Sequence, residues 1–93
     1  MLVHVTLYGA LRVIAGRQML DMSFDEQHIT MMQLLEALTA LYPRIGPYLI
    51  DHSSQTLHTE MRVLLNGTRP QPGLTLSTPL YDNDRLTFLV ASH

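Results

Sequence analysis

Residues 78–93 are Thr-Pro-Leu-Tyr-Asp-Asn-Asp-Arg-Leu-Thr-Phe-Leu-Val-Ala-Ser-His, and this stretch decides the fold. The Asp-Asn-Asp segment at residues 82–84 consists of turn-forming residues, and asparagine also tolerates a left-handed backbone. Behind it Leu86, Phe88 and Val90 recur at every second position, so they share one face of a strand. The stretch therefore predicts a tight turn followed by a strand over residues 85–91.

The amino-terminal residues predict a hairpin. Residues 2–8 and residues 18–24 both alternate apolar and polar side chains, the period of a half-buried strand. Residues 9–16 between them are too apolar for a bare loop, so we expect one helical turn that folds back on the core. The side chains expected to point inward from the two strands are Val3, Val5, Leu7, Leu20, Met22 and Phe24.

The clearest local signal marks a helix of about three turns. Thr30 and Gln33 are spaced as a capping box, and Ile29 and Leu34 are spaced as a hydrophobic staple. Pro43 disfavours helical geometry at the residue before it and ends the helix. The apolar stripe predicted to face the core is Met31, Leu34, Leu35, Leu38 and Leu41.

The remaining segments complete an α+β pattern. Residues 44–59 are irregular, with a short turn expected at residues 48–50. A third strand is expected over residues 60–66, closed by an Asn-Gly turn. Pro70 and Pro72 prevent a long partner strand, so any strand near residues 74–76 should be short and at an edge. The order β-β-α-β-(β)-β predicts one β-grasp (ubiquitin-like) domain over residues 1–93. Its mixed sheet of four to five strands would carry one main helix on one face, with the terminal strands central and parallel.

Composition narrows the classes of function. Charged residues make up 15% of the chain, against about 25% in typical soluble domains, which favours a partner or self-association. The net charge of −2 and the lack of a basic run argue against nucleic acid. No secretory signal or membrane-length apolar run is visible, so we expect no membrane partner and a cytoplasmic protein. The chain has no cysteine and no lysine, which excludes thiolate chemistry and a lysine Schiff base.

Four segments in order resemble the ThiS/MoaD family of ubiquitin-like sulfur carriers, and especially MoaD-type small subunits of molybdopterin synthase. They are Leu-Tyr-Gly-Ala-Leu-Arg-Val-Ile-Ala-Gly at residues 7–16, the helix from Thr30 to Leu38 with the following Tyr-Pro, Val-Leu-Leu-Asn-Gly at residues 63–67, and the closing turn and strand. The resemblance implies that an ATP-binding partner enzyme adenylates the carboxyl end, which then becomes a thiocarboxylate. It implies no bound cofactor, and a protein partner that is this adenylating enzyme or a synthase large subunit.

The chain departs from the family at its tail. Family members end in Gly-Gly, whereas Ala91, Ser92 and His93 stand here. The tail of a family member threads a narrow channel in its activating enzyme, where backbone without Cβ fits best. We therefore expect this tail to resist activation as written.

The face of the sheet opposite the helix is the candidate docking face. An exposed aromatic and aliphatic cluster is costly to leave in water, and scattered apolar surface residues are the alternative interpretation. The family's use of this face for partners favours docking. The residues predicted to form this docking face are Thr6, Tyr8, Arg62, Leu64, Thr87 and Leu89.

Three functions remain open from the sequence. The first is an interaction module of the ThiS/MoaD fold that binds a partner or itself, and the second is a working sulfur carrier or synthase subunit. The third, a small histidine-dependent enzyme, is disfavoured because no nucleophile, base and orienting group can be assembled. The histidines follow no metal-ligand spacing, so no metal site is expected. These histidines are His4, His28, His52, His58 and His93.

Overall fold

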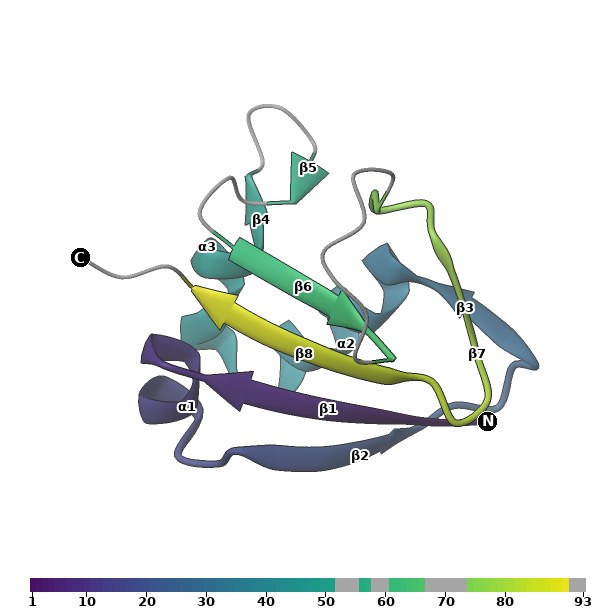
Figure 1. Cartoon of the computed structure of the whole chain (residues 1–93), viewed down its shortest axis with the longest axis horizontal. Helices are drawn as coiled ribbons and strands as arrows, with labels where there is room; N and C mark the ends of the chain where they lie inside the picture. The colour runs from purple at the N-terminus through teal and green to yellow at the C-terminus, as the bar shows by residue number, and fades with distance from the viewer. Residues whose placement is uncertain (52–55, 58–60, 67–73, 91–93) are drawn as a thin grey trace.

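The computed structural model describes residues 1–51, 56–57, 61–66 and 74–90, and its centre is a mixed four-stranded sheet (Figure 1). The strands are β1 (Leu2–Tyr8), β2 (Met19–Ser23), β6 (Met61–Leu65) and β8 (Arg85–Val90), in the order β2-β1-β8-β6. β1 pairs with β8 in parallel, and the other two pairings are antiparallel. The predicted fold class is therefore confirmed, including the parallel central pair.

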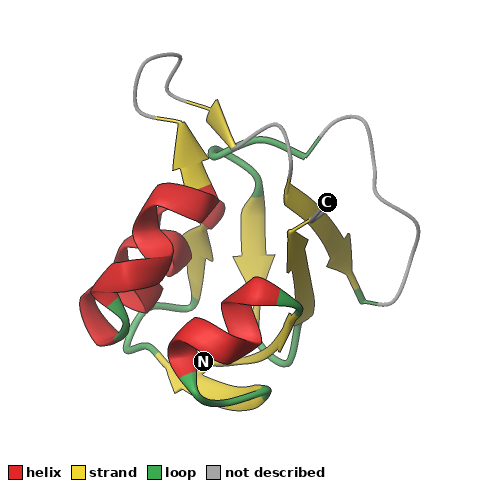
Figure 2. Cartoon of the chain, turned by 90° about the vertical axis from the view of Figure 1, so that its left-hand side faces the viewer, coloured by secondary structure: helices red, strands yellow, loops and turns green. Residues whose placement is uncertain are grey.

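The helices lie on one side of this sheet (Figure 2). They are α1 (Ala10–Ala15), α2 (Met31–Leu41), the single 3-10 turn η1 (Pro43–Ile45) and α3 (Gly46–Leu49). The inward side chains of the strands pack with α2, and Val5, Leu7, Leu35, Leu86 and Phe88 are at most 1% exposed. No helix formed by the described residues covers the opposite face of the sheet, which is the face toward the reader in Figure 1.

The capping box at the start of α2 is confirmed. The Thr30 side chain accepts a hydrogen bond from Gln33 N, and the Gln33 side chain accepts one from Thr30 N at 2.8 Å. The stripe prediction is wrong at its end, because Leu41 is 58% exposed. At 100° per residue Leu41 lies about 80° around the axis from Met31, in the last turn of the helix. The fully buried Leu34 lies only about 20° from Leu41 around the axis, so the position of Leu41 at the end of α2 exposes it rather than its angle.

The optional short strand of the predicted element order lies further along the chain than residues 74–76. Those residues form no strand, and the short strand lies further on at β7 (Pro79–Tyr81), which pairs with β3 (His28–Thr30). A turn forms here instead, since Thr75 N donates to Thr78 Oγ1 at 2.9 Å and Thr78 N donates to Thr75 O at 3.1 Å. Local hydroxyl bonds thus satisfy backbone groups that a strand would have paired. A further short pair joins β4 (Ile50–Asp51) to β5 (Thr56–Leu57).

The predicted acidic turn at residues 82–84 is present and ties three strands together. Asn83 has a φ of 67°, the left-handed conformation expected of it. Leu2 N donates to Asp82 Oδ1 at 2.7 Å, and Tyr81 N donates to Asp84 Oδ2 at 2.8 Å. Asn66 follows β6 with a φ of 56°, and its Nδ2 donates to Asp84 Oδ1 at 3.2 Å. The turn therefore anchors the start of β1, the start of β8 and the end of β6.

Candidate functional site

The predicted docking residues fall in two rows across the open face of the sheet. Strand register places Tyr8 beside Leu89 and Leu89 beside Arg62. The second row joins Thr6, Thr87 and Leu64 in the same way. The rows arise because every second side chain of a strand points to one face, while the alternate positions Leu7, Phe88 and Val63 point into the core.

Five of the six predicted residues line one groove, which we call the apolar groove. It has a volume of about 620 Å³ and a lining that is almost entirely carbon. Tyr8 is 43% exposed and Leu89 is 42% exposed, so both present apolar surface to solvent. The residues of the apolar groove are Tyr8, Gly9, Arg62, Leu64, Thr87 and Leu89.

Thr6 is the predicted residue that does not line the apolar groove. It belongs instead to a smaller hollow of about 280 Å³ toward the start of β1, where His4 and Arg85 also lie. The tail residues Ala91, Ser92 and His93 lie outside the described part of the chain. The last described residue is Val90, one position after a residue of the apolar groove.

A second hollow adjoins the apolar groove and was missed from the sequence. It has a volume of about 810 Å³ and lies around α1, and we call it the arginine hollow. Gly9 lines both hollows and connects β1 to α1 with a φ of 61°. One signal could have revealed it, because the first twenty residues contain two arginines and no acidic residue. The residues of the arginine hollow are Gly9, Ala10, Arg12, Val13, Gly16, Arg17 and Gln18.

The histidines that the structure describes do not assemble a catalytic set. His4 Nδ1 lies 2.7 Å from Asp21 Oδ1, and the His28 ring lies 6.1 Å from the ring of Tyr81. His52, His58 and His93 lie outside the described residues. Among the residues that are described, no three histidine, aspartate or glutamate side chains gather as a metal site would require. In the same part of the chain no helix is long and apolar enough to cross a membrane.

Comparisons with solved structures find the same fold over the whole chain. SAMP1, small archaeal modifier protein 1 of Haloferax volcanii, is 18% identical over 99% of this chain and 97% of its own, with a TM-score of 0.80. A putative molybdopterin converting factor, subunit 1, from Pyrococcus furiosus is 14% identical over 99% of both chains, with a TM-score of 0.75. CysO from Mycobacterium tuberculosis is 28% identical over 97% of this chain and 99% of its own, with a TM-score of 0.74.

No protein-family model and no curated protein matches the chain. The solved neighbours are small ubiquitin-like carriers or modifiers, and the expected resemblance is confirmed at the level of structure. The chain has the ubiquitin-like β-grasp fold of the ThiS/MoaD-type proteins that it resembles.

Proposed function

We propose that this protein is a non-catalytic docking module of the ThiS/MoaD type that binds a partner protein through the apolar groove. The partner is an adenylating enzyme or the large subunit of a synthase. The observation that carries the proposal is the groove itself, where Tyr8, Leu64 and Leu89 make an apolar surface on the helix-free face. Tyrosine is enriched in protein interfaces, where it supplies large contact area at low entropic cost.

The solved neighbours support a protein partner. The Pyrococcus furiosus neighbour is named as one subunit of a converting factor, and such a name implies a second subunit. The strand register supports the same site, because the two rows present their side chains on three neighbouring strands. A rigid sheet needs little ordering when it binds, so more of the contact energy is left for affinity.

A working sulfur carrier is the second candidate, and the position of β8 favours it. Leu89 lines the apolar groove, and β8 ends at the next residue, Val90. A partner seated in the groove would therefore contact the end of β8, the strand that precedes the tail in sequence. In this candidate the carboxyl terminus of the protein would become the thiocarboxylate.

Binding measurements test the docking proposal. The protein, untagged at its carboxyl end, is titrated by calorimetry against the adenylating enzyme and against the synthase large subunit of the same organism. Leu64→Glu and Leu89→Glu place a carboxylate in the groove, and each should weaken binding at least about thirtyfold, as loss of a hot-spot residue does. Leu41→Glu adds the same charge on an exposed site of α2 and should leave the affinity unchanged.

The proposal is contradicted if both groove variants still bind the partner while circular dichroism shows that they are folded.

Mass spectrometry distinguishes the docking module from the sulfur carrier. After incubation with the adenylating enzyme, ATP and a sulfur donor, a carrier gains the mass of sulfur in place of oxygen. A docking module forms the complex and keeps its mass.

A further inference from the structure

The apolar groove and the arginine hollow share Gly9, so they form one continuous surface. We propose that this surface recognises a protein segment in which apolar side chains are followed by carboxylates. This inference rests on the proposed function and specifies the chemistry of the partner. The apolar side chains occupy the groove between Tyr8, Leu64 and Leu89, and the carboxylates reach Arg12 and Arg17.

The arginine hollow offers two guanidinium groups that can bind carboxylates. Arg12 and Arg17 are both exposed, and within the described part of the chain neither side chain makes a hydrogen bond or an ion pair. A guanidinium group presents a planar fork of donors that fits a carboxylate with two parallel hydrogen bonds. Val13 lies between the two arginines in sequence and is 79% exposed, which continues the apolar surface into the hollow.

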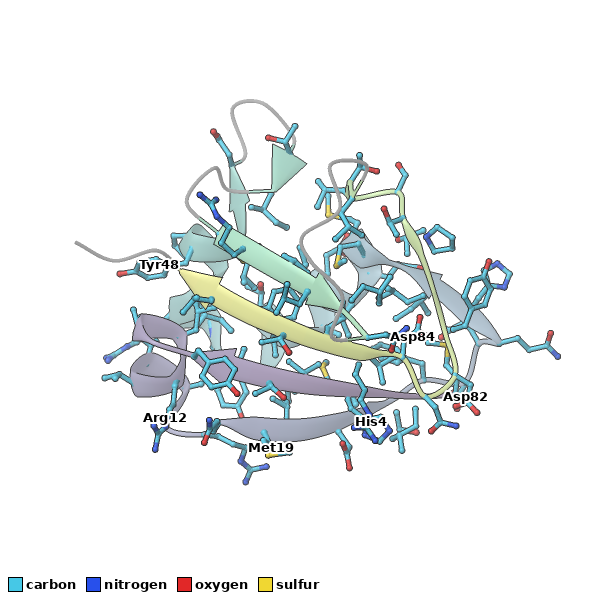
Figure 3. The ribbon with its side chains drawn as sticks, viewed as in Figure 1. His4, Arg12, Met19, Tyr48, Asp82 and Asp84 are labelled. Atoms are coloured by element: carbon cyan, nitrogen blue, oxygen red, sulfur yellow. The ribbon has the colours of Figure 1, made fainter. Side chains whose placement is uncertain are left out.

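Arg12 and the acidic turn at residues 82–84 lie at opposite ends of the sheet. Figure 3 shows Arg12 at the α1 end of the sheet and Asp82 and Asp84 at the opposite end. None of the acidic residues that the structure describes lines the apolar groove or the arginine hollow. The α1 end is therefore locally positive although the chain has a net charge of −2. Such a separation attracts and orients an acidic partner during its approach.

The backbone keeps the two halves of this surface in fixed relation. Gly9 has a φ of 61°, a conformation that side-chain-bearing residues seldom adopt, and it turns the chain from β1 into α1. Leu11 is fully buried and holds α1 against the core. Arg12 is consequently held by a packed helix, and Gly9, which follows Tyr8, lines the hollow together with both arginines.

A nucleic acid or a second copy of this chain fits the surface less well. Nucleic-acid binding draws its affinity from many phosphate contacts, whereas this surface offers two unpaired arginines beside a carbon-lined groove. A second copy carries Asp82 and Asp84 at its far end, but these carboxylates already accept backbone and side-chain hydrogen bonds within their own turn. An acidic and apolar protein segment uses both halves of the surface.

Nuclear magnetic resonance on the 15N-labelled full chain tests the inference with synthetic peptides. One peptide has an apolar run followed by glutamates, and a matched peptide has the same run followed by lysines. The glutamate peptide should shift the amide signals of Leu89 and Val13 together, and the lysine peptide should bind more weakly. Arg12→Glu and Arg17→Glu should each weaken the glutamate peptide about fivefold at low salt, an effect of the size measured for exposed ion pairs. High salt should reduce this difference.

Arg85→Glu is the matched control for charge. Arg85 is exposed on the same face but lies four residues before Leu89 in β8, about 13 Å along the strand. Reversing the charge of Arg85 changes the net charge by the same amount, and it should alter the affinity for the glutamate peptide less than twofold.

Several results would overturn the inference. The inference fails if the two peptides bind with equal affinity or if neither arginine reversal changes the affinity. It also fails if the glutamate peptide does not bind at millimolar concentration, or if an oligonucleotide binds more tightly than the glutamate peptide. Signal shifts at Leu89 that grow with protein concentration alone would assign the surface to a second copy. The partner titrations described above test the proposed function independently of this inference. If Leu64→Glu abolishes partner binding while the arginine reversals do nothing to partner or peptide, this inference fails and the proposed function stands.

Discussion

Replacing Asp84 by alanine should test how strongly the acidic turn holds the sheet. The Asp84 carboxylate accepts a hydrogen bond from Tyr81 N at 2.8 Å and another from Asn66 Nδ2 at 3.2 Å. Asn66 in turn accepts a bond from Arg85 N at 2.8 Å through its Oδ1. The substitution Asp84→Ala removes both acceptors and frees the Asn66 side chain that supports the start of β8.

The expected loss follows from these distances. A hydrogen bond to a charged group contributes about 1.5–3 kcal/mol, and exposure to water places these two at the low end. The 3.2 Å bond is long and contributes less than the 2.8 Å bond. We therefore expect the free energy of unfolding to fall by about 2 kcal/mol. In a domain of this size such a loss lowers Tm by roughly 8–16 °C.

Chemical and thermal denaturation followed by circular dichroism measure this loss. Asp25→Ala is the matched control, because Asp25 is exposed and the described structure gives its side chain no hydrogen bond. The control removes the same charge and should change stability by less than about 0.5 kcal/mol. An Asp84→Ala variant as stable as the Asp25→Ala variant would refute the reasoning.

Three further predictions concern single side chains. Thr30→Ala removes the helix cap and should lower the free energy of unfolding by about 1 kcal/mol in urea denaturation, while Thr30→Ser keeps it. Leu38→Ala should cost about 2–5 kcal/mol because Leu38 is fully buried, whereas the helical neighbour Leu41→Ala should cost under about 1 kcal/mol; similar losses at the two sites would contradict the burial pattern. Asn83→Gly should leave Tm nearly unchanged and Asn83→Val should lower it, since a β-branched residue disfavours a φ of 67°; equal Tm values would show that the turn does not need this conformation.

Strong local signals explain why most of the fold could be predicted. The alternation in residues 2–8 corresponds to β1 at the same bounds, and the capping box places the start of α2 to the residue. These features depend on side-chain periodicity and on bonds between near neighbours in sequence. Tertiary contacts seldom change features of this kind.

The failures occur where distant segments or helix ends decide the outcome. β7 exists because it pairs with β3, and residues 74–78 adopt a turn whose hydroxyls bond to nearby backbone. Leu41 continues the apolar spacing, but α2 ends there and exposes it. The spacing of residues along the sequence does not predict such contacts.

The candidate site likewise has a part that the sequence predicts and a part that it does not. Strand alternation places Tyr8, Arg62, Leu64, Thr87 and Leu89 on one face, and register then gathers them in the groove. Thr6 satisfies the alternation and is in register with Thr87, but it lines the smaller hollow with His4 and Arg85. The arginine hollow depends on the direction in which α1 leaves Gly9, which sequence periodicity does not contain.

The parallel pairing of β1 with β8 also determines when the protein can fold. Leu2 N bonds to the Asp82 side chain 80 positions later, and β8 is the strand that joins β1 to β6. Until β8 has been translated and has left the ribosome, the nascent chain holds an isolated hairpin and a separate strand with open edges. A nonsense codon before Arg85 should therefore yield a product that is degraded rather than a shortened functional protein.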